Sequence, residues 1–182
     1  LGLGLATGLR YQCGLVGVGL AAVLLGQKQL GTALKIGAVA LVTFALTQLS
    51  DLFVWGEPFV QLRAYLAYNG SHAGDYPTGP WYTYLLTLIG LLIPPVSLLI
   101  TFGLFYGLYA YFTSRSPADT RPEKDAVTSS TALANRHTLA LWLRIAVPAL
   151  LFLVVHSIYA NKQERFILPV VPLVITTGLV GW

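Results

Sequence analysis

A short polar and charged cluster lies between two apolar runs near the end of the chain, from His156 to Arg165. Lys162, Glu164 and Arg165 follow one another closely in it, and the flanking runs are long enough to span, or nearly span, a bilayer. Charge this close to hydrocarbon is costly, so it favours a functional explanation over a packing one. Lysine and arginine are suited to holding a phosphate, because the guanidinium offers a planar fork of donors and the ammonium a mobile point charge.

The composition is that of an integral membrane protein. Of the 182 residues, 55% are hydrophobic and 10% are charged, and the mean hydropathy is +0.69, whereas a soluble domain has about a quarter charged residues. The net charge of +4 comes with no basic, aromatic-interleaved surface for nucleic acid, so it is interpreted as a topology signal. Cys13 is the single cysteine, which excludes a disulfide within the chain and fits a small buried residue.

Five apolar segments predict an all-α fold, a polytopic transmembrane helix bundle of about five spans. They are residues 11–26, 30–49, 81–112, 139–157 and 166–182. Because Pro94-Pro95 lies near the middle of the third segment, we expect one kinked span there, with two half-helices as the alternative. Residues 1–182 then form a single membrane-embedded region. The chain has no methionine and begins and ends in apolar sequence, so we expect an internal fragment of a longer protein.

The distribution of lysine and arginine orients the predicted bundle, since these residues accumulate in cytoplasmic loops. Residues 113–138 are rich in Ser, Thr, Pro and Ala and are net basic, which predicts a flexible cytoplasmic loop, and the basic connection 26–35 is assigned to the same side. Residues 50–80 then lie outside. Lys162, Arg165 and Arg10 also fall at the outer face, where the rule disfavours cations. We interpret them as facing an anion, with tolerated interfacial charge as the alternative.

The outer loop 50–80 contains two further features. Residues 58–69 place apolar and aromatic side chains at helical spacing after Pro58, which predicts an amphipathic helix on the membrane surface. Asp51 is a candidate catalytic residue that could assist a base, and a helix cap is the alternative. The three histidines lie on different segments without metal-ligand spacing, so no metal and no cofactor are expected.

Three stretches follow one another in an order that is typical of one enzyme family. Asp51, Gly56 and Asn69 match an Asp, a Gly and an Asn after an amphipathic stretch. A Tyr-Gly-x-x-Pro-Trp motif followed by aromatics has Pro77 in place of its Gly, and the matching residues are Tyr76, Pro80, Trp81, Tyr82 and Tyr84. A His-Ser motif followed by His-Lys-Glu-x-Arg-Phe has Asn161 for the His and Gln163 for the Glu, and the matching residues are His156, Ser157, Lys162, Arg165, Phe166, Pro169 and Pro172. The chain thus resembles the GT-C-fold lipid-linked mannosyltransferases, which build GPI anchors and lipid-linked oligosaccharides.

This resemblance implies transfer of mannose from a polyprenyl-phosphate donor to a lipid-linked or glycan acceptor, on the non-cytoplasmic side of a bacterial inner membrane or of the endoplasmic reticulum. The partners would be the lipid bilayer, the donor and the acceptor. The donor phosphate would bind Lys162, Arg165 and Arg10, and the candidates for the substrate site are Asn69, Trp81, Tyr82, His156, Asn161 and Glu164. The family's main catalytic acid lies in a first outer loop, which we expect upstream of this fragment.

Two other functions remain as alternatives. A transporter or flippase segment would carry inverted repeats and ionisable residues at the membrane midplane. No internal repeat is evident, and the charges are concentrated at one predicted face, which favours the enzyme. A non-catalytic membrane scaffold is made less attractive by the grouping of Lys162 with Arg165 and by Asp51.

Overall fold

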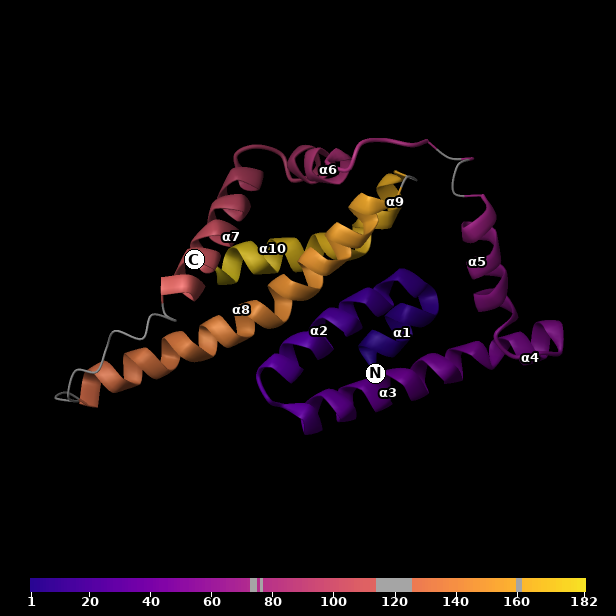
Figure 1. Ribbon diagram of the computed structural model, residues 1–182, viewed down its shortest axis with the longest axis horizontal. Coiled ribbons are helices and arrows are strands. Elements are labelled where there is room, and N and C mark those ends of the chain that lie inside the picture. The colour runs from indigo at the N-terminus through magenta and orange to yellow at the C-terminus, as the bar shows by residue number, and fades with distance from the viewer. Residues whose placement is uncertain (73–74, 76, 114–125, 160–161) are drawn as a thin grey trace.

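The computed structural model describes residues 1–72, 75, 77–113, 126–159 and 162–182, and the side chains of 126–136 lie outside this description. Every element in this part of the chain is helical (Figure 1), so the predicted all-α fold is confirmed. The N-terminal half contains α1 (Gly2–Leu9), the 3-10 helix η1 (Tyr11–Cys13), α2 (Gly14–Gly26), α3 (Leu30–Gln48), α4 (Ser50–Trp55) and α5 (Val60–Ser71). The C-terminal half contains α6 (Thr83–Leu91), α7 (Val96–Thr113), α8 (Ala126–Ile158), α9 (Glu164–Ile167), η2 (Leu168–Val170) and α10 (Val171–Val180).

Three helical stretches in the described ranges are long and apolar enough to cross a membrane. They are Leu30–Trp55 across α3 and α4, Val96–Thr113 in α7, and His137–Ile158 in α8. Each corresponds to one of the five predicted segments. The first predicted segment forms the shorter apolar stretch Tyr11–Gly26, and the last forms α9, η2 and α10. Length and composition therefore support an integral membrane protein.

The proline pair divides the third predicted segment into two helices. α6 ends at Leu91, α7 begins at Val96, and Pro94-Pro95 lies between them. Figure 1 shows α6 along one edge of the molecule and α7 running away from it at a steep angle. The expected single kinked span is therefore wrong, and the alternative of two helices holds. Proline supplies no backbone N–H and its ring obstructs the preceding turn, so two in succession end the helix.

Part of the predicted cytoplasmic loop 113–138 is helical. α8 begins at Ala126, so residues 126–138 continue into the apolar part of the helix without a break, while residues 114–125 lie outside the description. Residues 126–147 include neither proline nor glycine, and their serines and threonines lower helix propensity only slightly. A flexible loop is therefore the wrong description of this half, and its cytoplasmic position stays a prediction.

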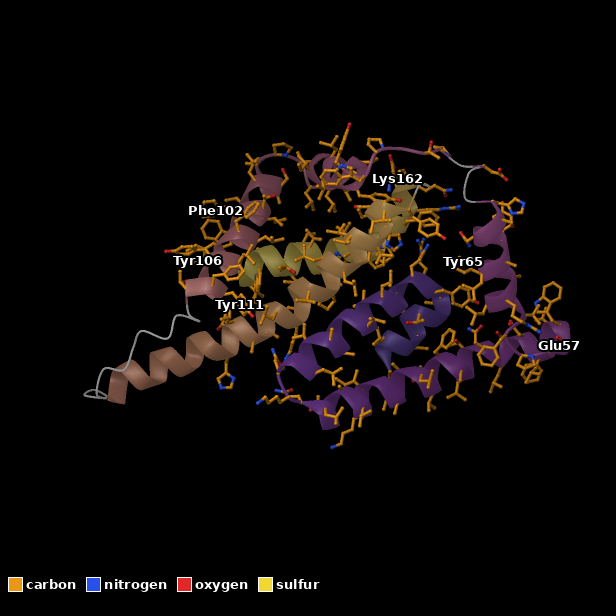
Figure 2. The ribbon with its side chains drawn as sticks, viewed as in Figure 1. Glu57, Tyr65, Phe102, Tyr106, Tyr111 and Lys162 are labelled. Carbon is orange, nitrogen blue, oxygen red and sulfur yellow. The ribbon has the colours of Figure 1, made fainter. Side chains whose placement is uncertain are left out.

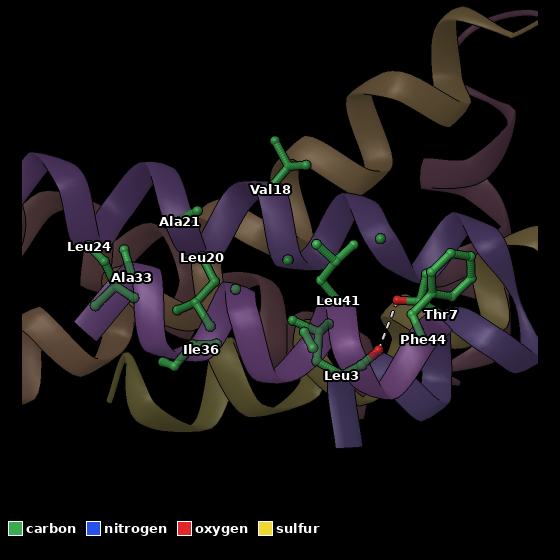
Figure 3. Close-up of a pocket in the computed structure, with 14 residues that line it drawn as sticks. Leu3, Thr7, Val18, Leu20, Ala21, Leu24, Ala33, Ile36, Leu41 and Phe44 are labelled. Carbon is green, nitrogen blue, oxygen red and sulfur yellow. Dashed lines mark hydrogen bonds between the residues drawn. The ribbon is translucent and has the colours of Figure 1, made fainter. Parts of the chain in front are cut away.

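Small residues allow close contact between the helices of the N-terminal half. A Cβ atom at Gly4 would lie 2.6 Å from the Cβ of Thr43, and one at Gly8 would lie 2.9 Å from the Cβ of Thr47, so α1 packs directly on α3. Figure 3 shows the apolar pocket between α1, α2 and α3, with a volume of about 360 Å³. The hydroxyl of Thr7, which lines this pocket, already donates to the carbonyl oxygen of Leu3 at 2.8 Å. The pocket suits an apolar occupant and offers little to a sugar.

The hydrophobic core lies where α6, α7, α8, α9, η2 and α10 meet. Its buried members are Tyr84, Leu88, Ile100, Ala149, Phe152, Leu153, Ile167, Val170 and Val174. Because lipid tails are as apolar as these side chains, close van der Waals packing is what stabilises the contact between α8 and the C-terminal helices in a bilayer. The core therefore fixes the C-terminal end of α8 against α9, where the charged cluster follows.

The predicted surface helix is present, shifted toward the C-terminus by two residues. α5 begins at Val60, after Phe59, whose φ is 61°. Leu62 and Tyr65 are half-buried as their helical spacing predicts, but the exposed fractions of Leu66 and Tyr68 are 61% and 47%. Apolar side chains thus lie on both faces of α5, and its position on a membrane surface stays a prediction.

Candidate functional site

The structure brings Arg10 and Arg165 together at one end of the bundle. Arg10 is extended (φ −144°, ψ 106°) and joins α1 to η1, whereas Arg165 lies in α9. The Nη1 atom of Arg10 donates a hydrogen bond to the carbonyl oxygen of Arg165 at 2.6 Å. Both side chains are exposed, and the guanidinium of Arg165 lies 5.5 Å from the centroid of the Phe166 ring. Two arginines predicted from separate segments are therefore neighbours, with the guanidinium of Arg10 against the backbone of Arg165.

These two guanidinium groups have no carboxylate partner among the described residues. The salt bridge found there joins Arg63 to Glu57 at 2.7 Å, on α5 and the turn before it. Glu164 is exposed in the first turn of α9, next to Arg165 in the chain, and forms no ion pair within the described ranges. The positive charge of Arg10 and Arg165 is thus left available for an anion.

Lys162 faces the protein with its ammonium group. Its Nζ donates to the carbonyl oxygens of His156 at 2.9 Å and Ser157 at 2.7 Å, and also to that of Tyr159. These carbonyls belong to the last turn of α8 and the residue beyond it, where a cation is favoured by the helix dipole. An ammonium has three donors, and all three are used. Lys162 was predicted to hold the donor phosphate; its ammonium caps α8 here, and a role toward the donor stays a prediction.

Further contacts hold Lys162 in this position. Its backbone N–H donates to the carbonyl oxygen of Pro77 at 2.9 Å, and its Nζ lies 5.1 Å from the centroid of the Tyr84 ring. Burial lowers the pKa of Lys162 below its ordinary value. Figure 2 shows Lys162 at the junction of α8, α9 and the segment before α6. This lysine therefore ties three segments together beside Arg165.

His156 is buried at the end of α8 and has a defined ring orientation. Its ring stacks on Phe152, with 4.1 Å between centroids and 15° between planes. Its Nδ1 lies 2.8 Å from the carbonyl oxygen of Phe152. Because a carbonyl only accepts, Nδ1 carries the hydrogen, which leaves Nε2 as the acceptor of the neutral imidazole.

A cavity lies between η1, α2, α5, the end of α8 and α9, with a volume of about 230 Å³. We call it the α5–α8 cavity, and its lining consists of Gln12, Leu15, Tyr65, Leu66, Asn69, Gly70, Val155, His156, Tyr159 and Phe166. Figure 2 shows Tyr65 between α5 and the beginning of α2. Burial raises the pKa of the Tyr65 hydroxyl, which therefore stays protonated as a donor. The cavity thus combines aromatic walls with neutral polar groups.

Two residues of this lining, Asn69 and His156, were candidates from the sequence, whereas Gln12 and Tyr65 were missed. Asn69 is held by a hydrogen bond from its Nδ2 to the carbonyl oxygen of Tyr65 at 2.8 Å. Gln12 is a single polar residue in an apolar run two positions after Arg10, and Tyr65 lies one helical turn before Asn69. The polar residue Gln12 and the helical spacing of Tyr65 and Asn69 were both visible in the sequence. Neither indicated that residues 11–13 and α5 meet in space.

Asp51 has a different position from the one expected. It is buried, with an exposed fraction of 1%, and its Oδ2 accepts a hydrogen bond from the backbone N–H of Gln61 at 3.0 Å. Gln61 is the second residue of α5, whose first N–H groups have no partner within the helix. Asp51 does not line the α5–α8 cavity. Its geometry is that of the helix-capping alternative.

The other candidates lie away from the cavity. Trp81 and Tyr82 are exposed and contact one another edge to face, with 5.8 Å between ring centroids. Asn161 and Tyr76 lie outside the described residues. Among the side chains that the structure describes, no group of three or more His, Cys, Asp or Glu residues gathers around a common point. The charge of this end of the bundle suits an anion.

A comparison with protein-family models decides between the functions left open above. The model of the Alg9-like mannosyltransferase family matches residues 15–182. The chain belongs to the Alg9-like mannosyltransferase family. No curated protein and no solved structure gives a significant match. The predicted family of lipid-linked mannosyltransferases with a GT-C fold is thereby confirmed.

Membership of the Alg9-like family identifies a membrane mannosyltransferase and argues against the transporter and scaffold alternatives. The matched range includes Asn69, His156 and Arg165, whereas Arg10 and Gln12 precede it. The contribution of the latter two to the site therefore rests on the contacts described here.

Proposed function

We propose that this Alg9-like protein transfers a mannosyl residue from a polyprenyl-phosphate donor to a lipid-linked or glycan acceptor at the non-cytoplasmic membrane face. In this reaction the bond between the sugar C1 and the phosphate oxygen breaks, and a bond from C1 to an acceptor hydroxyl oxygen forms. The hydroxyl proton passes to a base of the enzyme. The phosphate leaves as a monoester and gains one negative charge, which the enzyme has to stabilise.

The observation that carries this proposal is the contact between Arg10 and Arg165. The two residues come from distant segments, the guanidinium of Arg10 donates a hydrogen bond to the backbone carbonyl oxygen of Arg165, and neither side chain has a carboxylate partner in the described ranges. Fixed cations beside a membrane stabilise developing phosphate charge without having to reorganise. A guanidinium also matches two phosphate oxygens at once, which an ammonium cannot do. Lys162 contributes by holding the end of α8, from which the segment to Arg165 continues.

The proposed membrane side rests on charge distribution. The connection between α2 and α3 contains Lys28 and no acid, whereas residues 50–80 contain three acids and Arg63 as their single cation. Positive charge favours cytoplasmic loops, so the α4–α5 region belongs outside. Asn69 of α5 and His156 of α8 line the same cavity, which supports a substrate site at the outer face.

The test is mannose transfer by the full-length enzyme in lipid vesicles, with polyprenyl-phosphate mannose compared against a nucleotide-linked mannose. We expect transfer from the lipid donor alone. Arg165→Ala should lower kcat by about 10²–10³-fold, the range seen for preorganised donors. The kcat of Arg165→Lys should lie between those of the parent and of Arg165→Ala, because the charge remains and the planar fork of donors is lost.

The matched control is Arg63→Ala, which removes an exposed arginine that is paired with Glu57. It should leave transfer near the parental rate. If both Arg165 variants insert normally and transfer mannose as fast as the parent, the phosphate site is assigned wrongly. Transfer from the nucleotide-linked sugar would contradict the proposed donor.

A further inference from the structure

The lining of the α5–α8 cavity is polar but uncharged. Gln12 and Asn69 contribute amides, Tyr65 a hydroxyl and His156 an imidazole, while Tyr65, Tyr159 and Phe166 contribute aromatic rings. Amides and hydroxyls both donate and accept hydrogen bonds, as the hydroxyls of a sugar require. Aromatic walls with a few fixed polar groups are the usual lining of a small-molecule site. The composition fits a neutral polyol better than a phosphate or a lipid chain.

We infer that the α5–α8 cavity binds the hexose ring of the donor, with Nε2 of His156 accepting a hydrogen bond from a sugar hydroxyl. This inference rests on the proposed function. The hydrogen bond from Nδ1 to the carbonyl oxygen of Phe152 at 2.8 Å fixes the tautomer, and the stack on Phe152 fixes the ring plane. The acceptor atom is therefore oriented before the ligand arrives, which lowers the entropy cost of binding.

The position of the cavity relative to Arg10 and Arg165 identifies which sugar it takes. Gln12 follows Arg10 by two residues and Phe166 follows Arg165 directly, and both Gln12 and Phe166 line the cavity. Both arginines therefore adjoin residues of the cavity lining, so a phosphate bound there would carry its sugar close to the cavity. The volume of about 230 Å³ is below the ~300–1,000 Å³ of sites for drug-sized ligands, so it suits one ring. The donor carries such a ring directly on its phosphate.

The test compares two lipids, polyprenyl-phosphate mannose and the same polyprenyl phosphate without sugar, for binding to the full-length enzyme. His156→Asn retains a donor near the position of Nδ1 and removes the acceptor at Nε2, whereas His156→Gln retains an acceptor near Nε2. We expect His156→Asn to weaken binding of the mannosylated lipid about tenfold, the factor for one lost hydrogen bond. Binding of the sugar-free lipid should be unchanged, and His156→Gln should restore most of the loss.

His72 supplies a matched control. Its Nδ1 lies 3.1 Å from the carbonyl oxygen of Tyr68, four residues earlier, and its ring stacks on Tyr68 at 4.4 Å, as His156 does on Phe152. His72 does not line the cavity, so His72→Asn should change neither affinity. A second variant, Tyr65→Phe, serves if the His156 variants do not accumulate. It removes one hydroxyl from the lining and should weaken binding of the mannosylated lipid but not of the sugar-free lipid.

The inference of a sugar subsite is overturned if His156→Asn and Tyr65→Phe leave the affinity for the mannosylated lipid unchanged. It is also overturned if they lower the affinities for both lipids equally. Failure of the proposed function is observed separately, in the parental enzyme. A parent that transfers no mannose from the lipid donor overturns the proposed reaction, whereas the sugar subsite depends on the ratio of the two affinities in the variants.

Discussion

The Nη1 atom of Arg10 lies 2.6 Å from the carbonyl oxygen of Arg165, and this hydrogen bond joins residues 155 positions apart. It connects the α1–η1 junction to α9 and holds the guanidinium of Arg10 against the backbone of Arg165. Neither arginine is neutralised by a carboxylate within the described part of the chain. The proposed phosphate site therefore depends on both segments at once.

Because the two arginines act on one ligand, their substitutions should not be additive. Arg10→Ala removes a cation and the hydrogen bond to the Arg165 carbonyl oxygen, so kcat/KM should fall by about 10–100-fold, as for a lost hydrogen bond to a charged group. The double variant with Arg165→Ala should lose less than the product of the two single losses. Steady-state kinetics of the four enzymes test this, and a fully additive result would indicate that the two residues act independently.

Lys162 should contribute to stability more than to donor binding. Lys162→Met leaves three carbonyl oxygens at the end of α8 without their donor, which should reduce the free energy of unfolding by about 1–2 kcal/mol. Thermal unfolding of the purified enzyme measures this, with Lys35→Met on the exposed surface of α3 as the control. If Lys162→Met instead weakens donor binding at unchanged thermal stability, its ammonium contacts the phosphate, as the sequence first suggested.

Asp51 should act through the position of α5. Asparagine retains an oxygen that accepts the backbone N–H of Gln61, so Asp51→Asn should preserve both abundance and transfer. Asp51→Ala removes the acceptor and should cost about 1 kcal/mol of stability and displace Tyr65 and Asn69, which α5 carries. Membrane abundance and mannose transfer are measured for both. Loss of transfer in a normally abundant Asp51→Asn enzyme would return the carboxylate to a chemical role.

Cysteine labelling tests the proposed topology. After Cys13→Ala, single cysteines are introduced at Ser71 of α5 and His137 of α8, both of which are exposed. In intact vesicles with the outer face exposed, a membrane-impermeant maleimide should label Ser71→Cys. It should label His137→Cys only after the vesicles have been permeabilised. The opposite pattern would move Arg165 to the cytoplasmic side and contradict transfer at the outer face.

Much of the fold was predictable because it depends on local properties of the chain. Apolar runs of sufficient length specify membrane helices, since every backbone polar group has to be satisfied inside a bilayer. The break at Pro94-Pro95 was visible as well, but its outcome was not. Whether two prolines kink a helix or separate two helices depends on the helices that pack against each half. Here Tyr84 and Leu88 of α6 and Ile100 of α7 all pack into the core formed with α8 and the C-terminal helices.

The family was also predictable from the sequence alone, because its three motifs are short and local, and the His156–Phe166 segment carries part of one of them. The roles within the motifs were not. Lys162 and Arg165 carry the same charge, and the sequence does not distinguish their roles. Only the tertiary structure turns Lys162 to the carbonyl oxygens of α8 and leaves Arg165 beside Arg10. Likewise, Gln12 and Tyr65 share a cavity with His156 because η1, α5 and α8 meet in space. Side-chain direction and contacts between distant segments follow from packing of the whole bundle, which no local pattern of residues encodes.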